Sequence, residues 1–292
     1  MAIRGDKVII TAALAGGGTT KFNNPAVPYT PEEFAEEAWK AYNSGAAIVH
    51  IHAKDPKTGL ATPEIPKIRD CVEAIRAKCP KIIINLSTAI TVGLKPEQRI
   101  APVIELKPEM ASLNTNTMNF ALADHKKGII RGEFIFENTF KMLVVFAKKM
   151  KENGVKPELE IYDPGGIFNV LLVRKQGGIF EEPLHFQFVF GVAGGMAFTP
   201  LGLCHLVSLI PQDATWSVCG VGPNQVPAAM QSAILGGHIR VGLEDNVRVP
   251  GGELAKGNWE QVEWAVKIAQ IFDRPVASPQ EAREILGLKP RA

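Results

Sequence analysis

The sequence predicts one α/β domain over residues 1–292, folded as a (β/α)₈ TIM barrel. Eight short runs rich in apolar and β-branched residues alternate with about eight helical segments. No linker and no shift in composition divides the chain. The length of 292 residues would also fit two small domains, but it is typical of one large barrel.

Each predicted strand is a short run of aliphatic and β-branched residues. The first, KVIITAAL, stops at the triple glycine 16–18, and the sixth, LHFQFVF, is soon followed by the glycine pair 194–195. The predicted strands cover residues 7–14, 46–53, 81–87, 110–115, 156–162, 184–190, 215–221 and 238–243.

Capping residues mark the predicted helices. Thr30, Pro31 and Glu33 form a capping-box pattern, and Gly45 provides the stop. A second start lies at Thr62-Pro63. The predicted helices cover residues 30–44, 62–78, a short helix within 95–109, 137–153, 166–176, 200–209, 225–235 and 259–272, with an extra helix at 278–286.

A doubly wound open sheet is the alternative fold. It would be favoured by a G-x-G-x-x-G fingerprint after the first strand, where the chain has only three consecutive glycines at 16–18. A Walker-type G-K-[ST] is also absent from the sequence. The barrel is therefore the preferred prediction.

Composition excludes several classes of function. The chain is 46% hydrophobic and 21% charged, with a net charge of +2 and no basic stripe, so we expect no nucleic-acid partner. No apolar stretch is long enough to span a membrane, and we expect no signal segment at the N-terminus. The four cysteines form no C-x-x-C pair. We expect a cytoplasmic protein without disulfides.

Two histidines lie near the end of the second predicted strand, AAIVHIHA. His50 and His52 are two residues apart, so their side chains project to the same side, about 7 Å apart along the strand. This spacing lets two imidazoles converge on one metal ion. The alternative is one core histidine and one loop histidine.

The active site of such a barrel lies at the C-terminal ends of the strands. Two histidines and one carboxylate form a common open zinc site, and Glu244, after the last strand, is the best third ligand. Other divalent ions also fit such a ligand set. The further polar residues at these ends are Ser87 and Thr88, Asn114 to Thr117, Glu160, Asp245 and Asn246.

Arg240 precedes Glu244 by four residues and points to the same side if the strand is regular. Its charge could hold a substrate carboxylate, with Asp245 orienting it. The alternatives are a salt bridge that fills a barrel layer and a polar surface turn at residues 242–246. Ser87 lacks a G-x-S-x-G elbow, so its hydroxyl is expected to bind substrate and not to act as a nucleophile. His185, His205 and His238 are predicted to be structural.

Several motifs together resemble the β-keto acid cleavage enzymes. The resemblance covers residues 5 to 290, in the family's order. The motifs are VHIHAKD (49–55), INLST (84–88), KPEMASLNTNTMNF (107–120), PELEIYD (157–163), HFQFVFGVAGGM (185–196) and GGHIRVGLEDN (236–246).

The resemblance implies a zinc-dependent, tetrameric barrel that exchanges acyl groups between a β-keto acid and acetyl-CoA, giving acetoacetate and a new acyl-CoA. It assigns His50, His52 and Glu244 to the zinc ion. It places Ser87 and Ser112 against the keto acid, and Arg240, Asp245 and Glu160 in the catalytic centre.

One departure bears on the substrate. The family member of lysine fermentation has a Glu after the first strand that meets the substrate ammonium, and Gly18 stands at that position here. Ile90 stands where that member has a small glycine. An uncharged or apolar β-keto acid without a 5-amino group is therefore the expected substrate.

Some roles stay open at the level of sequence. Either Arg240, tuned by Asp245, or Asp245 itself removes the C2 proton; arginine rarely gives up its own proton. The residues that bind CoA are not marked, and the loops 194–195 and 220–225 are candidates by analogy with other barrels. The two alternative functions for this sequence are a metal-dependent amidohydrolase and a non-catalytic, metal-stabilised binding barrel.

Overall fold

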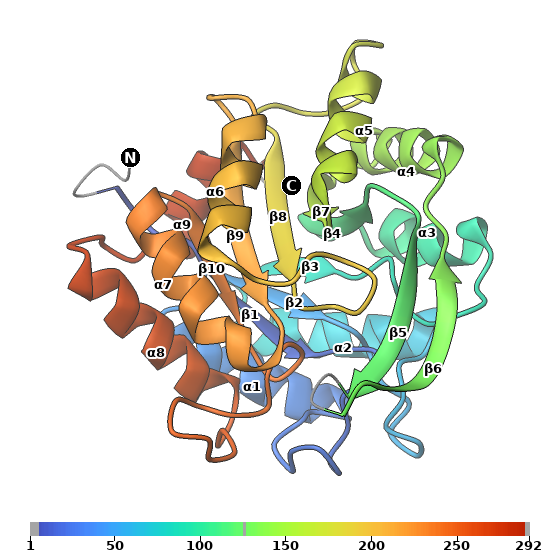
Figure 1. The fold of residues 1–292 in the computed structure, drawn as a ribbon. Coiled ribbons are helices and arrows are strands. Elements are labelled where there is room, and N and C mark those ends of the chain that lie inside the picture. The colour runs from blue at the N-terminus through green and yellow to red at the C-terminus, as the bar shows by residue number, and fades with distance from the viewer. Residues whose placement is uncertain (1–5, 125–126, 290–292) are drawn as a thin grey trace.

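The computed structural model describes residues 6–124 and 127–289 (Figure 1). Its main sheet has eight parallel strands: β1 (Ile10–Ala15), β2 (Ile48–Ile51), β3 (Ile83–Leu86), β4 (Met110–Asn114), β7 (Lys156–Ile161), β8 (His185–Phe190), β9 (Thr215–Gly220) and β10 (His238–Val241). They follow one another around a closed barrel in that order, and β10 pairs with β1. The predicted barrel is confirmed, and the open sheet is wrong.

Helices surround the barrel and connect its strands. They are α1 (Pro31–Asn43), α2 (Ile65–Lys78), α3 (Pro96–Leu106), α4 (Phe140–Glu152), α5 (Pro164–Arg174), α6 (Pro200–Leu209), α7 (Gln225–Leu235), α8 (Asn258–Ile271) and α9 (Pro279–Leu286). The capping box at the start of α1 is formed as predicted. The α2 helix begins three residues later than predicted, because the Thr62 N–H bonds the Ala53 carbonyl oxygen and Glu64 takes the N-cap position.

The prediction contained no element between β4 and α4, and this was wrong. Two strands, β5 (Met118–Asp124) and β6 (Ile129–Phe136), form an antiparallel pair outside the barrel (Figure 1). This insertion extends the connection after β4, and most of β6 is exposed to solvent. Ala121 of β5 forms a bridge with Ala193, which follows β8, so the pair lies beside the C-terminal ends of the barrel strands.

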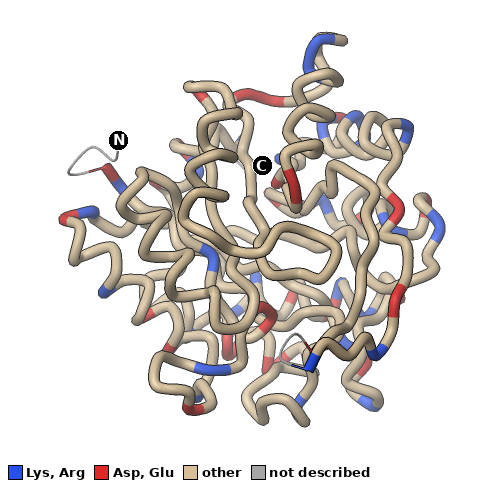
Figure 2. The backbone as a smooth tube through the Cα atoms, in the orientation of Figure 1, with Lys and Arg blue, Asp and Glu red and all other residues tan. Residues whose placement is uncertain are grey.

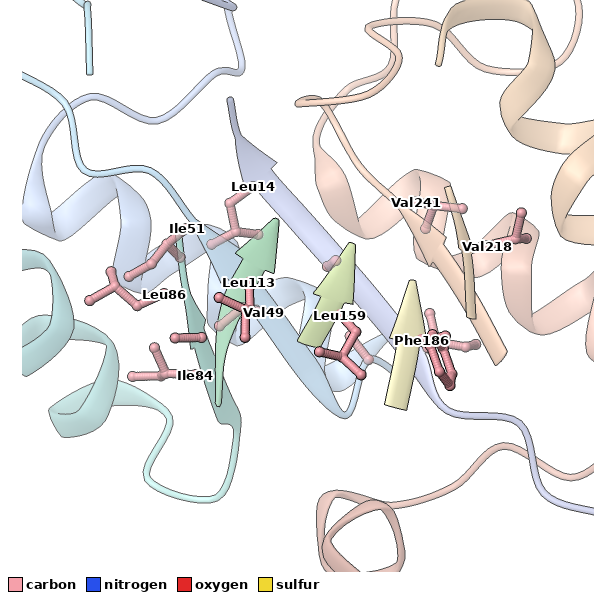
Figure 3. Close-up of a cluster of buried hydrophobic side chains, with 14 of the residues drawn as sticks. Leu14, Val49, Ile51, Ile84, Leu86, Leu113, Leu159, Phe186, Val218 and Val241 are labelled. Carbon is pink, nitrogen blue, oxygen red and sulfur yellow. The ribbon is translucent and has the colours of Figure 1, made fainter. Parts of the chain in front are cut away.

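The hydrophobic core lies between the barrel and the helices. Alternate strand residues point outward into it, including Val49 and Ile51 of β2 and Leu159 of β7 (Figure 3). The residues between them point into the barrel, and many are polar, including His50, Asn85 and Glu158. The interior of this barrel is therefore a polar lumen and not an apolar core.

The N-terminal end of the lumen is closed by apolar side chains. Ile48, Ile83 and Met110 from three strands, with Ile9 directly before β1, pack against α9 residues, among them Leu286. The lumen is accordingly reached from the C-terminal ends of the strands. Lysines and arginines alternate with acidic residues along the backbone trace (Figure 2). Across residues 6–124 and 127–289, no helix is long and apolar enough to cross a membrane.

His238 lies inside the closed end of the barrel. Its buried imidazole should make the stability of the fold depend on pH. Its Nδ1 accepts the Ile9 N–H at 3.1 Å, and its ring neighbours that of His185. Burial, with the charge of Arg274, lowers the pKa of His238 to about 3. Between about pH 6.5 and 3 the unfolded chain therefore binds a proton that the folded chain does not. The free energy of unfolding should fall by about 1.4 kcal/mol per pH unit through this group as the pH drops.

The variant His238→Asn keeps a side-chain acceptor for Ile9 and removes the titration. We expect it to lose about 1.4 kcal/mol less stability per pH unit than the native chain below about pH 6. Urea unfolding at pH 7 and pH 5 measures this difference. His205→Asn, at an exposed position on α6, is the control. Equal acid sensitivity of the native chain and His238→Asn would contradict the prediction.

Candidate active site

Three potential metal ligands converge at the C-terminal ends of the strands. His50 lies on β2, and His52 is the first residue after that strand. Glu244 follows β10. The Nε2 atom of each histidine lies 3.6 Å from Oε1 of Glu244, and one ligand atom from each residue falls within 4.8 Å of the others. The predicted pairing of the histidines with Glu244 is therefore present in the geometry.

A tight turn after β10 brings Glu244 to this position. The last strand ends at Val241 and not at Leu243 as predicted, because Gly242 has a φ of 146° and turns the chain. The Glu244 N–H then bonds the Ala13 carbonyl oxygen at 3.1 Å. A Cβ atom at Gly16 would lie 2.7 Å from Cγ of Glu244, so the glycine after β1 leaves the space that the ligand needs.

The imidazoles are suited to bind a cation. Burial and the nearby charge of Arg240 lower the pKa of His50 well below its ordinary value, and burial lowers that of His52 to about 3. Both rings are therefore neutral and carry a lone pair. Burial also raises the pKa of Glu244, and its Oε2 atom is buried without a hydrogen-bond partner among the described residues. Two neutral nitrogens and one carboxylate with an unpartnered oxygen match the donor set of a zinc site.

Arg240 lies beside this cluster in the lumen. Its Nε and Nη2 atoms each donate to Asp245 at 2.9 Å, in a bidentate pair, and Nη2 also donates to Glu244 at 2.6 Å. Burial disfavours the cation, but Asp245 and Glu244 raise the pKa of Arg240 well above its ordinary value. Arg240 therefore remains a cation, and its Nη1 atom has no hydrogen-bond partner in the described part of the chain.

Glu160 and Asn114 form the facing wall. Glu160 lies 3.7 Å from Nη1 of Arg240 across the lumen and accepts a hydrogen bond from the Tyr162 hydroxyl at 3.3 Å. Burial raises the pKa of Glu160 to about 7, although Arg240 opposes this shift. Asn114 pairs in register with Glu160, and both polar atoms of its buried amide lack partners among the residues described. These groups are placed to meet a polar substrate.

The serine and threonine hydroxyls predicted to contact the substrate also form hydrogen bonds within the protein. The Thr88 hydroxyl donates to the Ser112 carbonyl oxygen at 2.8 Å, while the Ser112 hydroxyl accepts the Thr88 N–H at 3.1 Å. The Ser87 hydroxyl accepts the Ala89 N–H at 3.1 Å. Among the described residues neither the Ser87 nor the Ser112 hydroxyl donates a hydrogen bond, so each can donate to a ligand, whereas the Thr88 hydroxyl uses its hydrogen within the fold.

The loop after β1 carries Gly18 and forms the rim of the site. The buried Lys54 ammonium holds the loop by donating to the carbonyl oxygens of Gly16 and Thr19. Gly18 is exposed, and a Cβ atom there would meet no heavy atom within 4 Å. A longer side chain at this position would therefore have room. Ile90 is part of the main hydrophobic core.

The two loops suggested for CoA lie at the same end of the barrel. The Gly222 N–H bonds the Asp245 carbonyl oxygen at 2.8 Å, so the loop after β9 adjoins the Arg240–Asp245 pair. Gly194 has a φ of 103° and packs closely on the backbone of β5.

Sequence reasoning missed four polar residues that face the lumen or the loop: Asn85, Glu158, Tyr162 and Lys54. Asn85 donates to Glu158 at 2.6 Å across the lumen. The signal was the alternation of polar residues in apolar strands, with Glu158, Glu160 and Tyr162 at every second position. An amidohydrolase site would need further histidines, but His185 and His238 lie together at the opposite end of the barrel.

Comparisons with known proteins agree with this geometry. A family model described as beta-keto acid cleavage enzyme matches residues 7–288. The chain is 46% identical over 283 residues to a 3-keto-5-aminohexanoate cleavage enzyme of Acetoanaerobium sticklandii, covering 97% of this chain and 99% of the relative. It is 33% identical to a 3,5-dioxohexanoate:acetyl-CoA acetone transferase of Paraburkholderia graminis, with 97% and 96% coverage.

A solved structure titled "Apo structure of ObcA" has the same fold. The TM-score is 0.76 at 23% sequence identity, over 90% of this chain and 66% of that chain.

Proposed function

The chain belongs to the β-keto acid cleavage enzyme family, and we propose that it transfers the acyl group of an apolar β-keto acid to CoA. Acetyl-CoA is the proposed cosubstrate, and acetoacetate and a new acyl-CoA are the products. The observation that supports this most directly is the cluster of His50, His52 and Glu244 beside the Arg240–Asp245 pair. A chelating ketone and carboxylate of one substrate would fit this combination of groups.

We propose that one divalent ion, zinc in preference, is held by Nε2 of His50, Nε2 of His52 and the Glu244 carboxylate. When bound, the ion supplies Lewis-acid polarisation of the substrate ketone. The remaining steps belong to the side chains. Arg240, which stays protonated, binds and orients the substrate carboxylate with its free Nη1 group.

Asp245 is our proposed base, because Arg240 keeps its own proton. Asp245 takes a C2 proton of the keto acid, and the C2 carbanion attacks the thioester carbon of acetyl-CoA. The C2–acetyl bond forms and the CoA thiolate leaves. That thiolate attacks C3, the C2–C3 bond breaks, and the electron pair returns to C2. Asp245 gives its proton back to C2, which completes acetoacetate.

The direct test uses metal-loaded protein, acetyl-CoA and a panel of β-keto acids. Mass spectrometry of the products should show acetoacetate and one new acyl-CoA, both dependent on acetyl-CoA. Products that form without acetyl-CoA would instead indicate a hydrolase. Absence of any product from the whole panel would contradict the proposed reaction.

The residue at position 18 bears on whether the substrate carries a 5-amino group. We propose that the substrate lacks a 5-amino group, because Gly18 offers no carboxylate to an ammonium. The variant Gly18→Glu has the room to place one, and a charge-assisted hydrogen bond contributes about 1.5–3 kcal/mol. We expect kcat/KM for 3-keto-5-aminohexanoate, relative to an apolar keto acid, to rise about 10- to 100-fold.

Gly18→Gln is the matched control, since it adds the same bulk without the charge and should not produce this rise. Efficient turnover of 3-keto-5-aminohexanoate by the native chain would contradict the proposed specificity. It would show that another group meets the ammonium.

We further propose that the protein is a cytoplasmic homotetramer, as the family resemblance implies. Exposed apolar side chains on the β5–β6 pair, including Leu122, Ile130 and Ile135, are available for contacts between subunits. The four cysteines are free, which is compatible with a reducing compartment. Light scattering coupled to size-exclusion chromatography tests the subunit number.

A further inference from the structure

A buried amide links two sides of the barrel lumen next to the proposed metal site. Asn85 of β3 pairs in register with His50 of β2, and its Nδ2 atom donates to Oε2 of Glu158 at 2.6 Å. Glu158 is on β7, which is separated from β3 by β4, so this hydrogen bond crosses the lumen. Asn85 and Glu158 are both completely buried.

His50 and Asn85 each have one buried polar atom that lacks a hydrogen-bond partner among the described residues. These atoms are Nδ1 of His50 and Oδ1 of Asn85. Asn85 and His50 lie side by side on neighbouring strands, since they pair in register. An imidazole Nδ1–H and an amide oxygen are complementary donor and acceptor.

We propose that Asn85 and Glu158 are positioning residues that fix the tautomer of His50. Glu158 holds the Asn85 amide in one orientation by accepting from Nδ2, which leaves Oδ1 to accept the Nδ1–H of His50. The His50 proton then stays on Nδ1, and the Nε2 lone pair faces Glu244. In the opposite amide orientation an NH₂ group would face Nδ1, move the proton to Nε2 and block the ligand atom.

This inference deepens the proposed function, since it concerns a ligand of the proposed metal ion. Partners of this kind orient metal-bound histidines in other proteins, and losing one costs about 10- to 100-fold in metal affinity. Neither Asn85 nor Glu158 needs to touch the substrate for this effect. The expected signature is weaker metal binding and a changed His50 tautomer, with the fold retained.

The first variant is Asn85→Leu, of similar size and without polar atoms. We expect zinc affinity, measured by competition with a chelating dye, to fall about 10- to 100-fold. Gln187→Met, which removes another buried lumen amide that bonds Ser217, is the matched control and should bind zinc as the native chain does. Equal zinc affinity in Asn85→Leu and the native chain would overturn the proposal.

A reciprocal exchange keeps the test decisive if Asn85→Leu fails to fold. Asn85→Asp alone places two carboxyl groups together and should weaken zinc binding. Adding Glu158→Gln reverses the donor and acceptor, because the amide introduced on β7 donates to the carboxylate introduced on β3, which still accepts from His50. We expect the double variant to regain most of the zinc affinity. Failure of the second change to restore any affinity would contradict the proposed chain of hydrogen bonds.

Nitrogen-15 NMR of the metal-free protein measures the tautomer directly. We expect the proton on Nδ1 of His50 in the native chain and a mixture of tautomers in Asn85→Leu. This measurement tests the role of Asn85 independently of the proposed metal site. If the native chain bound no zinc, the proposed metal site would be wrong, and the tautomer would still decide the role of Asn85. A native ring protonated on Nε2 would overturn that role.

Discussion

Replacing Asp245 by Asn should lower kcat about 10³-fold while bound metal stays near its native level. Asp245 accepts two hydrogen bonds from Arg240, and an asparagine can keep only one of them. It also cannot take a proton from carbon. Because Asp245 is not among the three converging metal ligands, the variant should retain the ion.

Two measurements test this prediction. Steady-state turnover with acetyl-CoA gives kcat, and metal analysis of the purified variant gives the ion content. Glu160→Gln is the informative comparison, since burial raises the pKa of Glu160 to about 7, a value suited to proton transfer. If Asp245→Asn turned over at the native rate while Glu160→Gln did not, Glu160 would be the base.

The sequence was sufficient to predict the barrel because its signals are local. Apolar strands, capping residues such as Thr30 and glycines after strands depend on neighbours a few residues away. The three candidate ligands were also predictable, since parallel strands bring their carboxyl ends to one face. Glu244 lies 192 residues after His52 in the sequence, and it still meets the two histidines there.

What could not be predicted depends on contacts across the lumen. The bond between Asn85 and Glu158 joins strands that are not neighbours, so no local pattern reports it. The turn at Gly242 likewise takes its shape from contact with Ala13 of β1. The β5–β6 pair was missed for another reason: it is a local hairpin inserted in a repeating pattern, and most of β6 lacks a buried face.

The polar lumen explains why the fold can hold this site. Burying Arg240, Glu158 and Glu160 costs free energy unless each charge or polar group is paired. The outward-facing apolar residues of the same strands supply the packing that stabilises the barrel (Figure 3). The interior is thus free to carry polar groups, several of which lack partners until a ligand arrives.

Removing one metal ligand should have the second large effect. Glu244→Gln keeps the size of the side chain and an oxygen that can accept from Arg240, but it loses the negative charge. We expect zinc affinity to fall by more than about 100-fold, because losing a ligand costs more than losing its outer partner. We expect kcat/KM at low zinc to fall about 10³-fold, the equivalent of about 4 kcal/mol of lost stabilisation.

Zinc titration separates affinity from chemistry in this variant. If the carboxylate serves only to hold the ion, activity should recover as zinc rises towards saturation. Incomplete recovery would show that the charge of Glu244 also sets the position of Arg240, to which it is bound at 2.6 Å. Glu253→Gln, on an exposed loop, is the control for loss of one negative charge. Full zinc occupancy of Glu244→Gln at native affinity would contradict the assignment of Glu244 as a ligand.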